Sequence, residues 1–297
     1  MKNFPTDVIS VNQLTQLLED PDVAKDLVLL DASIPPVGKM VMPEACWPAV
    51  TLPNALRFDI NDDFRDPAGK YSHMMATAEQ FNQAAQKLNI HASAKIVVYD
   101  CFGIFSSARA WWMFKAMGHR HVAVLDGGLP AWLRENLKVS SAISETSTQQ
   151  HSAPLFNGDL DKSYFVDWQT VQSALTDHST CIVDARAAQR FSGQAPEPRA
   201  GIRGGHMPNA LNLPYTELLD SENKLKSKID LVKVFEQRLQ LSAHTNHQHY
   251  IFSCGSGVTA CVIALAAESV GLTNLSVYDG SWSEWGSRSD LPVETGE

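Results

Sequence analysis

The sequence has no apolar segment long enough to cross a membrane and no excess of basic charge. No apolar run reaches the ~18 residues that a membrane span needs, and residues 1–11 lack the apolar core of a secretion signal. The 24 basic residues are outnumbered by 33 acidic ones, which gives a net charge of −9. This balance argues against nucleic acid or a membrane as the main partner. We expect a globular protein of the cytoplasm.

Cysteine is also scarce, and no two cysteines form a Cys-x-x-Cys pair. The five cysteines stand far apart, at positions 46, 101, 181, 254 and 261. Their spacing and odd number argue against a disulfide framework and against a structural zinc site. Each is by default a small buried hydrophobic residue, and only Cys254 has a local sequence that indicates chemistry.

The chain repeats itself at a shift of 153 to 155 positions; residues 96–100, for example, match residues 250–254. Each copy spans about 130 residues, which is the size of a domain and not of a solenoid unit. We predict an N-terminal domain over 1–139, a linker rich in Ser, Thr and Gln over 140–158, and a C-terminal domain over 159–297.

Short apolar strands alternate with helical patterns within each copy. The second copy is predicted to contain strands at 181–184, 249–254 and 275–278 and helices at 168–176, 231–239 and 258–270. Continuous apolar strands covered by helices predict an α/β fold, in which each domain has a mostly parallel sheet flanked by helices. Ligands of such sheets bind beyond the carboxyl ends of the strands.

Cys254 stands at such a strand end. A loop of small residues at 255–259 separates it from a helix-like stretch. This order directs backbone N–H groups and a helix N-terminus at one sulfur, which favours the thiolate and forms a nest for an anion. We therefore predict that Cys254 is a catalytic nucleophile that carries sulfur.

Over nearly its whole length the chain resembles the two-domain rhodanese-like sulfurtransferases. The resemblance rests on the Cys254 loop and on residues 105–114, 124–128, 183–186, 205–212 and 279–282. It implies two tandem rhodanese-like domains, of which only the C-terminal one is active. Asp100 stands where the second copy has Cys254, and a carboxylate cannot accept a sulfane sulfur. Cys101 lies one position out of register and is expected to pack.

The uncharged loop after Cys254 is similar to that of the 3-mercaptopyruvate sulfurtransferases, because members that prefer thiosulfate typically carry cations there. In the mercaptopyruvate enzymes two arginines, matched by Arg190 and Arg199, hold the carboxylate and carbonyl oxygens of the substrate. A guanidinium fits a carboxylate with two parallel hydrogen bonds. On composition alone, both would be read as surface arginines. The persulfide is expected to rest on the loop amides, with Gly255, Gly257, Val258 and Thr259 among the binding residues.

The resemblance also implies a relay that runs from a serine through a histidine to an acid. Ser256 and His73 match the serine and the histidine. The acid is open: Asn61 holds the matching position, and Asp62 and Asp63 follow it. Either aspartate takes the role, with Asp63 our candidate, or the relay is incomplete.

We expect a sulfurtransferase that moves sulfur from 3-mercaptopyruvate through a persulfide on Cys254 to a small thiol, to thioredoxin or to cyanide, releasing pyruvate. No metal or organic cofactor is implied. The alternatives are a thiosulfate sulfurtransferase and a non-enzymatic sulfur carrier or binding module. A cysteine phosphatase would need an arginine where Ala260 stands, and an oxidative sensor would pair Cys254 with Cys261.

Two further groups are expected to be structural. Arg186 directly follows a buried strand and should form an ion pair. His244, His247 and His249 cluster before the strand that leads to Cys254, where a solvated loop is the expectation and a metal site the rival.

Overall fold

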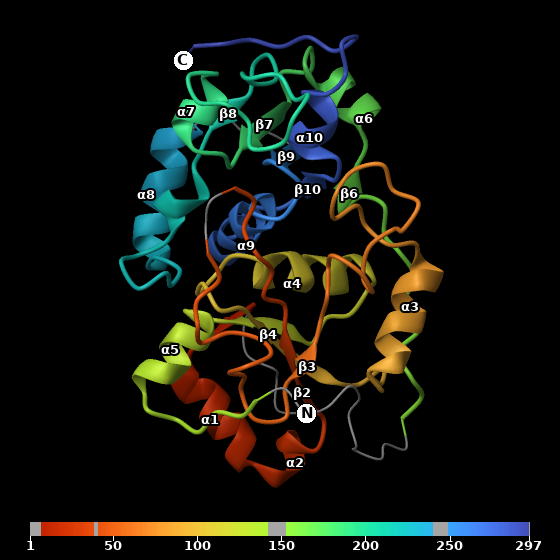
Figure 1. The fold of residues 1–297 in the computed structure, drawn as a ribbon, viewed down its shortest axis with the longest axis vertical. Helices are drawn as coiled ribbons and strands as arrows, with labels where there is room; N and C mark the ends of the chain where they lie inside the picture. Colours follow the sequence, from red (N-terminus) through yellow and green to blue (C-terminus); the bar gives the residue numbers. More distant parts are fainter. Residues whose placement is uncertain (1–6, 39–40, 142–152, 240–248, 297) are drawn as a thin grey trace. The chain divides into compact units, whose positions relative to one another are not determined.

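The computed structural model describes residues 7–38, 41–141, 153–239 and 249–296. Its backbone contacts define two compact units, whose elements are labelled in Figure 1. Unit 1 contains most of the first half of the sequence together with Ser221–Leu225, and unit 2 contains most of the second half together with Ala68–Met74. Each unit thus takes a short segment from the other half of the sequence, and the contiguous domain boundaries stay a prediction.

Unit 1 is built on a parallel sheet in the order β1-β5-β4-β2-β3. The strands are β1 (Val8–Ile9), β2 (Leu27–Asp31), β3 (Leu56–Arg57), β4 (Lys95–Tyr99) and β5 (Val122–Leu125). The helices are α1 (Val11–Glu19), α2 (Pro21–Ala24), α3 (Ala78–Lys87), α4 (Ser107–Ala116) and α5 (Gly128–Arg134). Capping boxes at Ser10 and Thr77 fix the starts of α1 and α3.

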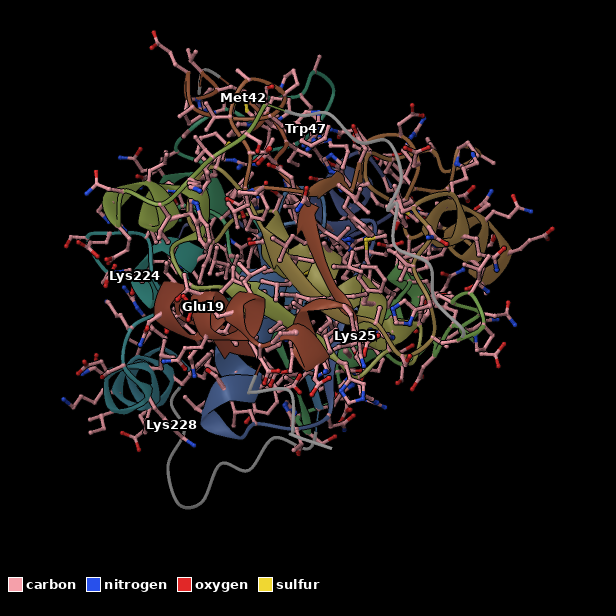
Figure 2. All side chains as sticks on the ribbon, turned by 90° about the horizontal axis from the view of Figure 1, so that it is seen from below. Glu19, Lys25, Met42, Trp47, Lys224 and Lys228 are labelled. Carbon is pink, nitrogen blue, oxygen red and sulfur yellow. The ribbon has the colours of Figure 1, made fainter. Side chains whose placement is uncertain are left out.

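The sheet of unit 1 is buried on both faces, as the uninterrupted apolar strands predict. On one face, Leu14 of α1 and Trp132 of α5 pack in a core cluster with alternate residues of β2 and β4. Met42, labelled in Figure 2, packs against this cluster from the loop that follows β2. Charged side chains such as Glu19, at the end of α1, are exposed.

Residues 142–152 of the predicted linker lie outside the described residues. Its last residues belong to the fold of unit 1, because Leu155 pairs with His91 and Phe156 is buried. The Phe156 ring lies edge-on to Phe81 and Phe114 in an aromatic cluster. Apolar residues at the end of a polar stretch therefore mark where the chain rejoins a core.

Unit 2 repeats this architecture, with a parallel sheet in the order β6-β10-β9-β7-β8. The strands are β6 (Phe165–Val166), β7 (Thr180–Asp184), β8 (Leu211–Asn212), β9 (His249–Ser253) and β10 (Leu275–Tyr278). The helices are α6 (Trp168–Ala174), α7 (Ala188–Phe191), η1 (Tyr215–Leu218), α8 (Lys228–Arg238), α9 (Ala260–Val270) and α10 (Ser281–Trp285). The predicted fold class is confirmed in both units.

The elements predicted for the second copy are confirmed, with ends shifted by a few residues. Asp167 caps α6 by accepting a hydrogen bond from the Thr170 N–H at 2.9 Å, and the helix ends at Ala174. α8 begins at Lys228 because the Ser227 side chain caps it. Among the described residues, no helix has both the length and the hydropathy that crossing a bilayer requires.

Candidate active site at Cys254

Cys254 lies at the carboxyl end of β9, which runs between β7 and β10 in the sheet of unit 2. The residue is buried, with 2% of its surface exposed. Its backbone is held from both sides: the N–H donates to Ser281 Oγ at 3.2 Å, and the carbonyl accepts from the Trp282 N–H at 2.9 Å. The predicted nucleophile therefore has a fixed backbone at the edge where α/β folds bind ligands.

The loop after Cys254 presents unused backbone donors. Within the described part of the chain, the N–H groups of Gly255, Ser256, Val258 and Thr259 make no hydrogen bond. Gly257 has φ +75°, a left-handed conformation that glycine adopts without strain. Because the loop leads directly into α9 and is mostly buried, these donors are suited to an anion bound beside the sulfur.

The first copy shows the same loop with an anion built into it. The buried carboxylate of Asp100 accepts hydrogen bonds from the N–H groups of Phe102 and Phe105, each at 2.8 Å. It also accepts from the N–H and hydroxyl of Ser107, at 2.9 and 2.7 Å. At the shift of 154 that aligns Asp100 with Cys254, Phe102 and Phe105 correspond to Ser256 and Thr259. Two of the donors that Asp100 occupies are thus left open around Cys254, whereas the N–H of Cys261, which corresponds to Ser107, donates to the Val258 carbonyl at 3.1 Å.

The neighbouring Cys101 has the packing role that the sequence suggests. It is 2% exposed and lies in a core cluster of unit 1. Burial raises the pKa of its thiol to about 12, with the nearby Asp100 carboxylate acting in the same direction. A thiol in this environment stays protonated and unreactive at neutral pH.

Both predicted arginines reach the Cys254 loop. Arg190 lies in α7 and Arg199 in the loop that follows it. A Cβ atom built on Gly255 would lie 3.2 Å from Arg190 Nη2 and 3.8 Å from Arg199 Nη1. The two guanidinium groups therefore converge on the residue next to Cys254. A side chain at position 255 would occupy the space between them and the loop.

A buried carboxylate neutralises one of these two arginines. Glu197, whose side chain is 3% exposed, accepts from Arg190 Nε at 3.2 Å and from Arg190 Nη2 at 2.5 Å. The same carboxylate accepts from Arg186 Nη1 at 2.8 Å. Arg186 in turn pairs with Asp184 at 2.6 Å and lies over the Trp282 ring at 4.2 Å. The expected structural ion pair of Arg186 is therefore present, and it anchors the carboxylate that orients Arg190.

Arg199 is the cation of the site that has no partner of its own. No carboxylate of the described residues lies within ion-pair distance of its guanidinium. Burial lowers the pKa of Arg199; the charges of Cys254 and Glu197 oppose this effect, and the charge of Arg190 adds to it. A half-buried cation beside an anion nest is available to a negatively charged ligand.

His73 lies close to Ser256, two residues after Cys254, as the family resemblance implied. His73 Nδ1 lies 3.0 Å from Ser256 Oγ, and the two residues are 7% and 6% exposed. His73 belongs to the Ala68–Met74 segment of unit 2 and has φ +65°, a left-handed conformation that is uncommon outside glycine. The Tyr71 hydroxyl, 3.3 Å from Ser287 Oγ, tethers the same segment.

The other exchanged segment repeats this turn in unit 1. Asn223 has φ +58° and stands four positions before the helix cap Ser227, as His73 stands four positions before the cap Thr77. A Cβ on Gly103, in the Asp100 loop, would lie 2.5 Å from Asn223 Cβ. The Asp100 loop is therefore covered by the equivalent turn, with asparagine in place of histidine.

The remaining predicted residues lie outside the Cys254 loop. Asp62 and Asp63 are exposed in a turn of unit 1, and the role of Asp63 as the acid stays a prediction. His249 Nε2 lies 2.8 Å from Ser276 Oγ, and His244 and His247 lie outside the described residues. The described part of the chain contains no group of three side chains suited to a metal ion.

Sequence reasoning missed two residues that shape the site, Glu197 and Ser281. Glu197 lies between two prolines, two positions before Arg199. An acid close to Arg190 and Arg199 in the sequence indicates an ion pair, although the sequence does not show that Glu197 pairs with Arg190. Ser281 lies in the 279–282 motif, where the signal was the alignment of serine with a glycine of the first copy.

Comparison with known proteins identifies the family of the chain. The rhodanese-like domain family matches residues 10–135 and 167–288. The 3-mercaptopyruvate sulfurtransferase of Homo sapiens is 37% identical over 283 residues, covering 94% of this chain and 91% of that protein. The thiosulfate/3-mercaptopyruvate sulfurtransferase 1 of Arabidopsis thaliana is 37% identical over 308 residues, covering 98% and 78%. The crystal structure of the 3-mercaptopyruvate sulfurtransferase SseA from Escherichia coli superposes with a TM-score of 0.78 at 31% identity, covering 94% of this chain and 99% of that one.

Proposed function

The chain belongs to the rhodanese-like family, and from this premise we propose that it moves sulfur from 3-mercaptopyruvate to a thiol acceptor through a persulfide on Cys254. The observation that carries the proposal is the uncharged, buried loop after Cys254, whose N–H groups at positions 255, 256, 258 and 259 have no acceptor among the described residues. Such a nest binds a sulfur anion without adding a fixed charge.

The charge balance of the site supports mercaptopyruvate as the donor. Glu197 neutralises Arg190, and Asp184 neutralises Arg186. Arg199 is left as one net cation, which matches the single carboxylate of a keto-acid. Thiosulfate carries two charges, and nothing in the loop after Cys254 would compensate the second. Arg190, fixed by Glu197, can donate to the carbonyl oxygen while Arg199 holds the carboxylate.

In the first half-reaction, the Cys254 thiolate attacks the sulfur of 3-mercaptopyruvate. A sulfur–sulfur bond forms, the carbon–sulfur bond breaks, and its electron pair leaves on the enolate of pyruvate. Protonation of the enolate carbon completes the release of pyruvate. The contact between Ser256 Oγ and His73 Nδ1 supports Ser256 as the source of this proton. Each loop N–H that reaches the developing charge contributes up to ~3 kcal/mol.

In the second half-reaction, an acceptor thiolate attacks the outer sulfur of the persulfide. The bond between the two sulfurs breaks, and its electron pair returns to Cys254, which regenerates the thiolate. A small thiol, reduced thioredoxin or cyanide can act as acceptor, because the outer sulfur is the electrophile in every case. The loop amides then hold the leaving thiolate as they held the persulfide.

The test is a donor panel with one fixed thiol acceptor, which compares kcat/KM for 3-mercaptopyruvate and for thiosulfate. We expect mercaptopyruvate to be preferred, and incubation with the donor alone to add the mass of one sulfur atom to the peptide that contains Cys254. Cys254→Ser should abolish both turnover and the added mass, and Cys101→Ser serves as the matched control. A higher kcat/KM for thiosulfate, or turnover by Cys254→Ser, would contradict the proposal.

A further inference from the structure

The start of α10 holds the backbone of the nucleophile through a serine in an unusual conformation. Ser281 is fully buried and has φ +48°, in the left-handed region that residues other than glycine rarely adopt. Its hydroxyl donates to the Tyr278 carbonyl at 2.8 Å and accepts from the Cys254 N–H at 3.2 Å. Strained residues of this kind persist where the surrounding structure needs them.

The first copy provides an internal comparison for this position. At the shift of 153 that aligns Asp126 with Asp279, Ser281 corresponds to Gly128, which begins α5 with φ +53°. The left-handed conformation is therefore a property of the fold in both copies. A Cβ on Gly128 would lie 2.3 Å from the Asp100 carbonyl oxygen, so that no side chain fits there.

The closing helix (α5 or α10) binds the residue that follows the strand in two ways, and only the hydrogen bond to the carbonyl of that residue is common to the two copies. The Leu129 N–H donates to the Asp100 carbonyl at 2.9 Å, as the Trp282 N–H does to the Cys254 carbonyl. Gly128 has no side chain that could bind the N–H of residue 100, whereas Ser281 binds the N–H of Cys254. The copy with the nucleophile thus carries a hydroxyl, at the cost of strain, where the copy without it carries glycine.

We propose that Ser281 is a positioning residue that fixes the direction of the Cys254 side chain toward the loop donors. The hydroxyl and the Trp282 N–H together hold both polar groups of the Cys254 peptide. Ser283 extends this clamp, because its N–H and hydroxyl both donate to the Gly255 carbonyl, at 3.0 and 2.5 Å. Because the Cys254 N–H donates to Ser281, the N–H groups that can bind the sulfur are those of the loop that follows.

The predicted effect of Ser281 on turnover rests on the proposed function. The predicted effect on the reactivity of the Cys254 thiol does not, and it is tested separately. The variants are Ser281→Gly, which removes the hydroxyl and the strain, and Ser281→Ala, which removes the hydroxyl alone. Ser276→Ala is the matched control, because Ser276 is also buried in unit 2 and its hydroxyl donates to the Ser163 carbonyl at 2.6 Å, away from the loop. Each protein is assayed for the alkylation rate of Cys254 by iodoacetamide, for kcat and KM, and for Tm.

Both Ser281 variants should lower the alkylation rate and kcat roughly 5- to 10-fold, the effect of about one hydrogen bond, with KM little changed. Ser281→Gly should keep Tm near that of the parent protein, because the lost hydrogen bond is offset by the relieved strain. Ser276→Ala should lower Tm and leave both rates unchanged. Parental rates in both Ser281 variants, or equal losses in Ser276→Ala, would overturn the role of Ser281. A parent protein that releases no pyruvate would refute the proposed function instead, while the alkylation rates still decide about Ser281.

Discussion

Replacement of Cys254 by aspartate should convert the second loop into a copy of the first. The carboxylate of Asp100 reaches the N–H groups of Phe102 and Phe105, each at 2.8 Å. The corresponding N–H groups around Cys254 belong to Ser256 and Thr259, and they have no acceptor in the described part of the chain. The outer atom of an aspartate lies two bonds beyond Cβ, as the outer sulfur of a persulfide does. The substitution therefore places a fixed anion where the mechanism places a transient one.

The stabilisation by the carboxylate is estimated as the difference in the free energy of unfolding between Cys254→Asp and Cys254→Asn, which has the same shape without the charge. A hydrogen bond to an ionised group contributes roughly 1.5–3 kcal/mol, against about 1 kcal/mol for a neutral pair. Two such bonds favour the aspartate by about 1–4 kcal/mol, and desolvation of the carboxylate removes part of this gain. With the uncompensated Arg199 nearby, we expect a net advantage of about 1–2 kcal/mol, or roughly 3–8 °C in Tm for a unit of this size.

The assay is calorimetric unfolding of both variants at pH 7.5 and at pH 3.5. Neither variant should transfer sulfur, and the aspartate variant should unfold at the higher temperature at pH 7.5. This advantage is present above the ordinary carboxyl pKa and should be lost as the pH falls below about 4, because the carboxylate then binds a proton. An aspartate variant that is less stable than the asparagine variant at pH 7.5 would show that the loop is not an anion nest.

Two further predictions concern the paired arginines and a buried histidine of unit 1. Arg199→Gln should raise KM for mercaptopyruvate about 10- to 100-fold, the loss of one charge-assisted pair, whereas Arg190→Gln should also lower Tm because it leaves the buried Glu197 with one partner fewer; equal effects on Tm would refute this division. Burial lowers the pKa of His119 to about 4, and its Nε2–H donates to the Ala94 carbonyl at 2.9 Å. The folded state thus resists protonation of His119, so that its contribution to the free energy of unfolding is fully present above pH 6.5 and is lost as the pH falls toward 4. Between pH 7.5 and 5 the loss is about 2 kcal/mol. His119→Gln keeps the donor and should remove this part of the pH dependence in urea unfolding; an unchanged dependence would contradict it.

The parts of the fold that sequence predicts well are those governed by local pattern. The five-residue apolar runs of β7 and β9 give unambiguous strands, and the repeat shows that both copies share one sheet order. The helical pattern predicts that α9 begins at Val258, two residues before its observed start at Ala260. Val258 and Thr259 continue the helical pattern, but they belong to the loop, and their N–H groups have no acceptor among the described residues.

The parts that sequence does not predict depend on contacts between distant residues. The exchange of Ala68–Met74 and Ser221–Leu225 between the two halves has no local signature, because it depends on which loop each turn covers. The family resemblance supplied His73, but not the left-handed turn that directs it at Ser256. The partner of Glu197 was equally hidden, since either neighbouring arginine could have reached it.

Comparison of the two copies shows how the same backbone carries an aspartate in one loop and a cysteine in the other. Both copies have the left-handed residue at the start of the closing helix and a covering turn of the same shape. The first copy fills its nest with the Asp100 carboxylate, which accepts from the N–H groups of Phe102, Phe105 and Ser107. The second copy has no acceptor for its nest among the described residues, and it holds the backbone of Cys254 with Ser281 instead. Buried N–H groups without an acceptor cost free energy of folding, so an open nest is less stable than a filled one. A bound anion removes this cost in the second loop. Catalysis requires that the anion formed in the transition state gain more from this than the bound substrate does.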